Sequence, residues 1–499
     1  MRRLLPVLAL LAFLGAMPGG RAANDLAERR VRAARALEKE GKLTEARDLW
    51  AALAAERPAG EWTDDALLAL ARLDWPVDDP DRLGSDPGAG PAIAAAIPRL
   101  ERIVREMPGS NSAPEAAWRL ALAHLDPASP SLDPSRAEAI LTTWPVLYPG
   151  GARLPEVLLL LAELRLEEGH PDRAARTVFR FLARWPDHPR AGRAWLVLAR
   201  AAGPAHPGSC LRRLGRAAVA AGERDPATAR RARGLATLLD RFGFAPHRQG
   251  DRPWRPRVEG GFTALPERAV DLAIDPRGVA WVALPRAGEV RSLSGDAVPL
   301  REAGVRAIAF DRWGRPWLAG TAGVRTPGGE LLVLPDRGTA EGLAPAGDGV
   351  SVFVLDGRNR RVVLLGPGVP PRVVTGLGAR PAPSRIAPDP ATGGAAVLDR
   401  KGGRLWVVGP DGTVREELAI GGIAPAPADV AVDAWGRPAI LDGKTGTVTV
   451  LARDGRPLAT FRLPREGELA LARPDLLALD DAGRLAVHDA RRRGVAWFD

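Results

Sequence analysis

The hydrophobic pattern of the chain changes near its midpoint. From Asn24 to about Arg241, apolar residues recur every three to four positions, which is the spacing of one face of an α-helix. The same spacing recurs before four prolines. An alanine lies twelve residues before each proline, and larger apolar residues lie eight and five residues before it. These prolines are Pro58, Pro108, Pro149 and Pro186. Each set predicts a helix that ends at its proline, because proline lacks the N–H that continues a helix.

The four sets predict a stack of helical hairpins, each with a first helix before the one that ends at the proline. The other expected helices span residues 26–40, 62–73, 113–125, 155–168, 190–202, 208–222 and 226–241. The alanine–proline spacing, with Gly41 and Gly169 before two of the second helices, resembles tetratricopeptide repeats (TPR). That resemblance implies a solenoid whose concave groove binds peptides or partner proteins.

Beyond Arg257 the chain consists of short apolar runs separated by Gly, Pro and Asp, a pattern typical of β-strands and tight turns. One phrase recurs at intervals of about 40 residues: an apolar strand, an Asp, a turn with Gly and a second apolar strand. Its turn aspartates are Asp275, Asp311, Asp348, Asp389, Asp433 and Asp480. A hairpin repeated in this way predicts a six-bladed β-propeller, with one blade for each copy.

Four blades carry a further Asp at the next turn, and these are Asp356, Asp399, Asp442 and Asp489. A strand followed by Asp and a basic turn with Gly or Asn resembles the NHL-repeat propellers, and Asp356, Asn359 and Arg360 match them best. The last blade lacks an outer strand at the C-terminus. Residues 258–265 lie just before the first blade and belong to none of the six blades. We therefore expect 258–265 to supply that strand and close the ring.

The first residues have the pattern of a cleavable secretory signal. A basic start is followed by an apolar run from Leu4 to Met17, which is short for a membrane span, and by small residues before Ala23. The expected fold class is a multidomain α plus β chain. Its predicted parts are a signal peptide at 1–22, a TPR-like solenoid at 23–242, a linker at 243–257 and an NHL-like propeller at 258–499. The exported protein would be periplasmic or secreted and would have no membrane span.

Composition limits the chemistry that the chain can carry. A single cysteine, Cys210, excludes an intramolecular disulfide and a cysteine-based metal cluster, and it is expected to be a small buried residue. Only His488 of the six histidines lies in a predicted blade. The repeated aspartates are expected to cap turns rather than bind metal. The net charge of +10 is spread along the chain, so no nucleic-acid partner is expected. No catalytic motif is present, and no catalytic residue, metal or cofactor is predicted.

Two propeller turns differ from the others because they carry a tryptophan between Asp and Gly. The candidate binding residues are Trp313 and Arg315 in one turn and Trp435 and Arg437 in the other. Stacking of these rings on a neighbouring loop is the alternative interpretation. The favoured hypothesis is an exported, non-catalytic scaffold that binds protein partners in the bacterial cell envelope through its solenoid and propeller surfaces. The alternatives are a module that binds glycan or peptidoglycan, and a propeller hydrolase or lyase.

Overall fold

The computed structural model describes most of the chain, namely residues 20–56, 60–84, 86, 88–204, 206–243, 254, 261–295, 298–311, 313–378, 380–467 and 469–499. The predicted signal peptide and linker lie almost entirely outside these residues, so both stay predictions. The chain divides into two compact units, Met1–Val157 and Leu158–Asp499. Nothing tests the predicted domain boundaries, which therefore also stay predictions.

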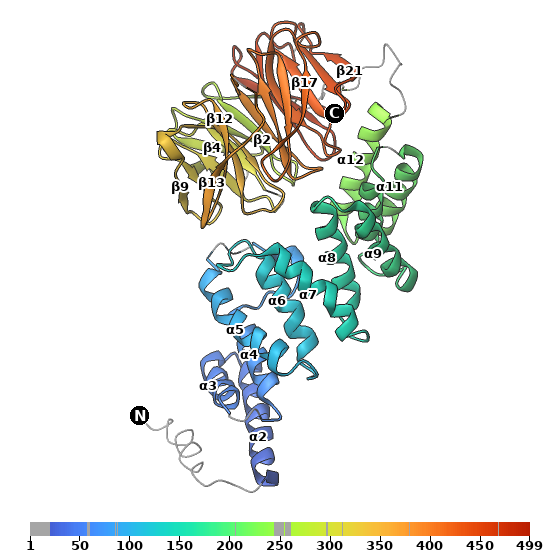
Figure 1. Cartoon of the computed structure of the whole chain (residues 1–499), viewed down its shortest axis with the longest axis vertical. Helices are drawn as coiled ribbons and strands as arrows, with labels where there is room; N and C mark the ends of the chain where they lie inside the picture. The colour runs from blue at the N-terminus through green and yellow to red at the C-terminus, as the bar shows by residue number, and fades with distance from the viewer. Residues whose placement is uncertain are drawn as a thin grey trace. The chain divides into compact units, whose positions relative to one another are not determined.

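Eleven α-helices precede the first strand in the described residues, as the multidomain α plus β prediction requires (Figure 1). The first unit contains α2 (Gly20–Lys39), α3 (Leu43–Ala54), α4 (Thr63–Asp74), the 3₁₀ turn η1 (Pro80–Arg82), α5 (Gly90–Glu106), α6 (Ala113–Leu125) and α7 (Pro134–Leu147). Helix α8 (Leu154–Glu167) crosses the boundary between the units. The second unit continues with α9 (Pro171–Arg184), α10 (Ala191–Ala202), α11 (Pro207–Ala221) and α12 (Pro226–Gly243).

The helices pack in the manner that the spacing predicted. Consecutive helices contact one another from α2 to α7 in the first unit and from α9 to α12 in the second. The alanines expected at the helix contacts are all fully buried, and these are Ala46, Ala96, Ala137 and Ala174. Gly41 and Gly169 have φ of 75° and 81° at turns between helices, a left-handed conformation that glycine adopts without steric cost. Helical hairpins are confirmed, while membership of the TPR family stays a prediction.

The second half is a six-bladed β-propeller built from six four-stranded antiparallel sheets. Blade 1 is β2 (Asp271–Ile274), β3 (Ala280–Leu284), β4 (Glu289–Ser292) and β5 (Leu300–Arg301). Blade 2 is β6 (Ala307–Phe310), β7 (Pro316–Ala319), β8 (Val324–Arg325) and β9 (Leu331–Leu332). Blade 3 is β10 (Ala340–Pro345), β11 (Val352–Asp356), β12 (Arg361–Gly366) and β13 (Val369–Val373), and the 3₁₀ turn η2 (Pro335–Arg337) precedes it.

The remaining blades follow the same order from the axis outward. Blade 4 is β14 (Arg385–Asp389), β15 (Gly394–Asp399), β16 (Arg404–Val408) and β17 (Val414–Ala419). Blade 5 is β18 (Pro427–Val432), β19 (Pro438–Asp442), β20 (Thr447–Leu451) and β21 (Pro457–Arg462). Blade 6 takes β22 (Pro474–Leu479), β23 (Leu485–Asp489) and β24 (Gly494–Phe498) from the C-terminus, and its outer strand is β1 (Phe262–Ala264).

Strand β1 closes the ring, as the sequence predicted. It pairs antiparallel with β24, in a register that places Phe262 opposite Ala496 and Ala264 opposite Gly494. The backbone N–H of Leu265 donates to the carbonyl of Arg493 at 2.6 Å, and the N–H of Trp497 donates to the carbonyl of Gly261 at 2.8 Å. The two ends of the propeller sequence thus share one sheet, in which β24 has a partner strand on both sides.

The turn aspartates act as caps. In each of the six turns the Asp Oδ1 accepts a hydrogen bond from the backbone N–H two residues further on. In four turns the same oxygen also accepts from the N–H four residues further on. The aspartates at the second turn of four blades are buried and also accept hydrogen bonds from backbone N–H groups. Asp489, for example, accepts from the N–H groups of Arg473, Arg491 and Arg492 at 2.7–2.9 Å. The predicted structural role of the repeated aspartates is therefore confirmed.

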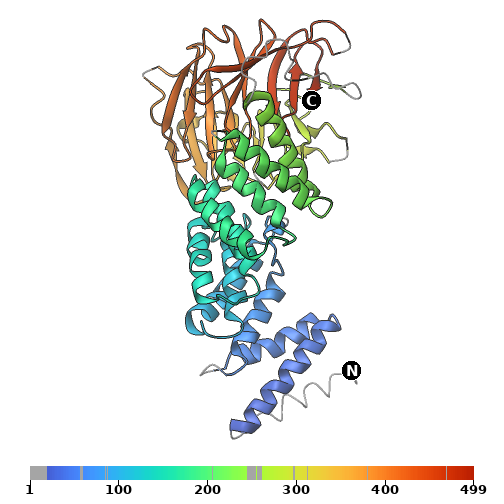
Figure 2. The same ribbon diagram turned by 90° about the vertical axis from the view of Figure 1, so that its right-hand side faces the viewer.

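The last helices share a hydrophobic core with the propeller. Leu235, Leu238 and Leu239 of α12 belong to one buried cluster with Phe461 and Phe498 of blades 5 and 6. Figure 2 shows the green helices of this region beside the orange-red strands. Trp254 joins the cluster, with its ring 5.8 Å from Phe461 and its indole N–H donating to the carbonyl of Gly483 at 2.9 Å.

Two glycines in these helices provide a matched test of that contact. A Cβ on Gly234 of α12 would overlap the backbone of the Ala482 turn in blade 6, whereas a Cβ on Gly215 of α11 has no atom within 4 Å. We expect Gly234→Ala to destabilise the second unit by about 1–3 kcal/mol, because neither backbone can yield without loss of contacts. Gly215→Ala should be neutral or stabilise by up to about 1 kcal/mol, as alanine favours a helix. Thermal unfolding of both variants measures this, and equal melting temperatures would contradict the close contact.

Candidate functional site

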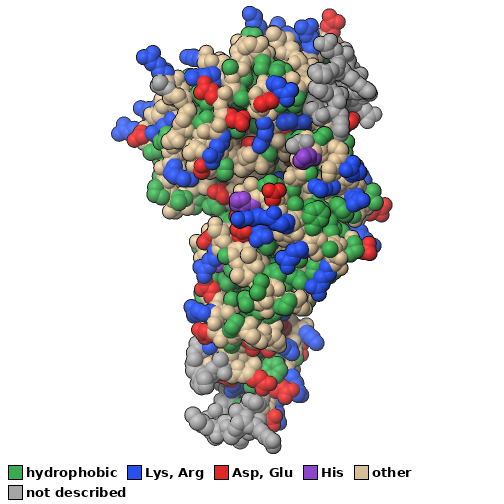
Figure 3. Space-filling model, turned by 45° about the vertical axis from the view of Figure 1, so that its right-hand side comes forward, with side chains coloured by type: hydrophobic (Ala, Val, Ile, Leu, Met, Phe, Trp, Pro, Cys, Tyr) green, Lys and Arg blue, Asp and Glu red, His purple; other side chains and the backbone are tan. Residues whose placement is uncertain are grey.

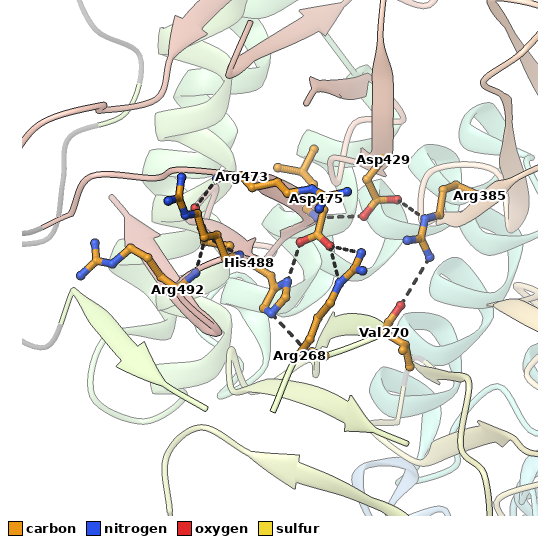
Figure 4. Close-up of polar contacts among 12 residues, drawn as sticks. Arg268, Val270, Arg385, Asp429, Arg473, Asp475, His488 and Arg492 are labelled. Atoms are coloured by element: carbon orange, nitrogen blue, oxygen red, sulfur yellow. Dashed lines mark hydrogen bonds and ion pairs between the residues drawn. The ribbon is translucent and has the colours of Figure 1, made fainter. Parts of the chain in front are cut away.

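The innermost strands of the blades surround the axis of the propeller. Strands β2, β6, β10, β14, β18 and β22 contact one another in succession, and β22 contacts β2 again. Asp271, Arg385, Asp429 and Asp475 lie near the beginnings of four of these strands. Because each blade runs in the same direction from the axis outward, these strand beginnings meet at one end of the axis. We call these four residues, with Arg268 and His488, the axial cluster; all of them except Asp271 are labelled in Figure 4.

Arg385 connects blades that lie on different sides of the ring. Its Nε is 3.7 Å from the Asp429 carboxylate in blade 5, and its Nη1 donates to the carbonyl of Val270 at 3.5 Å, just before blade 1. Blades 1 and 4 are opposite each other in a ring of six, so this side chain reaches across the axis (Figure 4). The guanidinium therefore occupies the centre of the ring at this level.

Two carboxylates of the axial cluster bind the backbone of the following blade. Asp271 accepts from the N–H of Ile308 at 2.9 Å, which joins blade 1 to blade 2. Asp429 accepts from the N–H of Leu477 at 2.8 Å, which joins blade 5 to blade 6. Burial raises the pKa of Asp271 to about 7 although Arg385 opposes that shift, and burial raises the pKa of Asp429 as well. Asp429 is buried and Asp271 is partly buried, so both are structural links whose carboxylates have reduced contact with water.

His488 is buried and pairs with the partly buried Asp475 where blade 6 meets blade 1. His488 Nδ1 lies 2.6 Å from Asp475 Oδ1, and the backbone N–H of Ala269 donates to His488 Nε2 at 3.4 Å. Since Nε2 faces a donor, the hydrogen-bond network assigns the proton to Nδ1. Arg268 donates to the other Asp475 oxygen at 2.7 and 3.1 Å. Both ring nitrogens are engaged, so the imidazole serves as a link between blades rather than as a free base or metal ligand.

The first pair of predicted binding residues lies at the junction of blades 2 and 3. Trp313 is half-buried, and its ring lies against Gly349 in the turn of blade 3. The Arg315 guanidinium lies 5.0 Å from the centre of that ring, and it donates to the carbonyl of Gly349 at 3.2 Å. The ring therefore packs on a neighbouring loop, which was the alternative interpretation of this turn.

The second pair lies under helix α12. Trp435 is 5% exposed and belongs to the core that α12 shares with the propeller. Arg437 donates from Nε to the Asp433 carboxylate at 2.7 Å and from Nη2 to the carbonyl of Leu238 at 3.3 Å. The structure does not bring the two predicted pairs together, and the second is covered. A binding role for these four residues has not been tested and stays a prediction.

The axial cluster was not identified from the sequence, although a signal for it exists. Asp271, Arg385 and Asp429 each stand four residues before the turn Asp of their blade. An even spacing on a strand places residues on the same face, so a charged residue at this position in several blades predicts a polar ring at the axis. Asp475 stands five residues before its turn Asp, at the register shift that interrupts the start of β22.

Other candidate groups are structural in the part of the chain that the structure describes. Cys210 is buried on α11 and directs its thiol to the carbonyl of Ala199 at 3.3 Å, and burial raises its pKa to about 11, which confirms the predicted inert role. Among the described residues no three His, Cys, Asp or Glu side chains are grouped as metal ligands. Within the same residues no helix has the length and apolarity to span a membrane. Figure 3 shows Lys and Arg side chains interspersed with acidic ones over the face drawn.

Comparison with known proteins yields structural similarity to the propeller alone. No family model matches the sequence, and no curated protein matches it. Virginiamycin B lyase from Staphylococcus aureus has 14% identity and a TM-score of 0.37, over 47% of this chain and 81% of that one. A calcium-binding regucalcin from Agrobacterium tumefaciens has 18% identity and a TM-score of 0.37, over 49% of this chain and 93% of that one. A gluconolactonase from Xanthomonas campestris has 15% identity and a TM-score of 0.38, over 50% of this chain and 95% of that one. Values this low carry no statement about activity, and the TPR and NHL resemblances stay predictions.

The raised pKa of Asp271 predicts a distinct pH dependence of stability. The folded state holds this proton up to about pH 7, whereas the unfolded chain releases it near pH 4. Between these values the folded state binds more protons, so this group lowers stability as the pH rises. Asp271→Asn removes the effect and keeps an oxygen acceptor for Ile308. The melting temperature of Asp271→Asn minus that of the wild type should therefore increase as the pH rises from about 5 to about 8.

Asp411→Asn is the control for that measurement. Asp411 is an exposed turn carboxylate whose pKa is lowered, chiefly by its hydrogen bond from Thr413. It stays ionised over the whole pH range in question, so the difference between this variant and the wild type should be constant. A constant difference for Asp271→Asn as well would show that Asp271 does not titrate in this range.

Proposed function

We propose that this protein is an exported, non-catalytic scaffold that binds protein partners in the bacterial cell envelope through its solenoid and propeller surfaces. The observation that carries the proposal is the core shared by α10–α12 and blades 5 and 6. A helical surface and a propeller surface are thereby held on one body. Such an arrangement raises the effective concentration of one binding surface once the other is engaged, so two weak contacts combine into a strong one.

The contacts of α12 support rigid presentation of both surfaces. Leu238 packs against the Gly483 turn, where a Cβ on the glycine would come within 2.7 Å of the leucine. The Arg437 guanidinium bonds to the carbonyl of the same leucine, and Arg231 forms an ion pair with Asp481 at 3.1 Å. Prior ordering of a binding surface reduces the entropy that binding costs. A scaffold gains from such ordering on both of its faces.

The state of the axial cluster favours binding over catalysis. A general base needs a nitrogen or carboxylate oxygen within reach of a substrate. In this cluster His488 uses both nitrogens, and Asp271, Asp429 and Asp475 are bonded to backbone or to Arg268. Wall-glycan binding through the turn tryptophans would need Trp435 at the surface, where α12 covers it. Export itself is supported by the N-terminal sequence pattern, which lies outside the described residues.

In-cell photo-crosslinking tests the scaffold function. A crosslinker is placed at Val219 on α11 and, separately, at Val298 on the loop before β5; both side chains are 83% exposed. We expect each position to give a discrete protein adduct in the envelope fraction, and the identified partner to bind the purified full chain. Gly234→Ala should weaken binding to a partner that engages both surfaces, because the two surfaces would no longer be held together.

His488→Gln separates this function from the catalytic alternative. Glutamine can still donate to Asp475, so the variant should fold and should leave the crosslinked adducts unchanged. The absence of any adduct at both positions, together with a small-molecule turnover that His488→Gln abolishes, would contradict the scaffold and establish a propeller enzyme instead.

A further inference from the structure

Four arginines line an open pocket at the junction of α8 and α9, two neighbouring helices labelled in Figure 1. The pocket has a volume of about 360 Å³, and its lining residues are Arg165, Arg173, Arg176, Thr177 and Arg180. Three of these arginines lie on α9 at spacings of three and four residues, which places their side chains on one face of the helix. The fourth lies in the last turn of α8. The pocket is separate from the axial cluster and from the turn tryptophans.

The α9 arginines are not neutralised within the described part of the protein. Arg173, Arg176 and Arg180 are exposed, and none of them forms an ion pair or a side-chain hydrogen bond with another described residue. Arg193 on the neighbouring helix α10 is different, because it binds Glu163 through two nitrogens. Like charges three or four residues apart on a helix repel one another. An anion in the pocket would relieve that repulsion.

The wall of the pocket is ordered by a buried hydroxyl. Thr177 is 3% exposed, and its Oγ1 accepts a hydrogen bond from Arg165 Nη1 at 2.9 Å. The same hydroxyl donates to the backbone carbonyl of Arg173 at 2.9 Å. The threonine thus fixes the Arg165 guanidinium beside the arginines of α9. A positioned guanidinium loses less entropy on binding than a freely rotating one.

We propose that this pocket binds a phosphate group. The planar fork of a guanidinium donates two parallel hydrogen bonds to phosphate oxygens, and several converging arginines suit a group with more than one charged oxygen. A volume of about 360 Å³ lies at the lower end of the range for small-ligand pockets, so it admits one or two phosphate groups. The phosphate can belong to a free small molecule or to the headgroup of an anionic phospholipid. This site goes beyond the scaffold function and does not depend on it.

Calorimetry with inorganic pyrophosphate and the purified full chain tests the site. We expect saturable binding that Arg176→Gln weakens at least about tenfold, because one bidentate partner is lost. Thr177→Val should also weaken binding, since it releases Arg165, although it removes no charge. Arg184→Gln is the matched control: this exposed arginine lies on the same helix and stacks on Trp185 at 4.9 Å, outside the pocket. It should change affinity less than about twofold.

Flotation with lipid vesicles distinguishes the two sources of phosphate. Pyrophosphate binding that is sensitive to Arg176→Gln supports a free phosphate ligand. Binding only to vesicles of phosphatidylglycerol, and not of phosphatidylcholine, with the same sensitivity supports a lipid headgroup. Absence of both, or an equal loss in Arg176→Gln and Arg184→Gln, overturns the proposal, because the second result is general charge attraction. Unchanged melting temperatures of the ligand-free variants show that the substitutions leave the fold intact.

Discussion

Closure of the ring is the constraint on which the rest of the second unit depends. Without a fourth strand in blade 6, β24 would expose the backbone donors and acceptors on its outer side, and the first and last parts of the propeller sequence would not be joined in one sheet. Here the fourth strand of blade 6 comes from residues that precede blade 1. The Asp475–His488 pair reinforces the same junction at the axis, because Arg268 and Ala269 belong to the segment that leads from β1 into blade 1. The junction is therefore joined both at its outer edge and at its centre.

The helices are attached close to this junction. Leu238 packs against Gly483 in blade 6. Trp254 donates to the carbonyl of the same glycine and makes an edge-to-face contact with Phe461 of blade 5. One blade thus completes the ring and also takes part in the core that it shares with α10–α12. A fault in closure would therefore disturb the helical surface as well, and this gives a physical reason for treating the two surfaces as parts of one scaffold.

The architecture was predictable because it follows from repeated spacing. Buried alanines such as Ala137, the capping aspartates and the borrowed strand all follow from residues at fixed intervals, and the structure confirms them. The candidate sites were less predictable because they depend on contacts between distant segments. The turn sequence around Trp435 is typical of an exposed residue, but α12 packs over this side chain. The residues near Trp435 in the sequence do not indicate that contact. The pocket arginines had a local signal, the stripe on α9, but Arg165 joins them only through Thr177.

Hydrogen exchange of the closing strand tests the central claim most directly. The N–H of Trp497 donates to Gly261 and that of Leu265 donates to Arg493, so both amides report on the pairing of β1 with β24. If closure holds the propeller together, these two amides exchange as slowly as those of β23 in the same sheet, since they open only when the blade unfolds. Rapid exchange at Leu265 and Trp497 while β23 stays protected would show that the ring is open and would contradict this account.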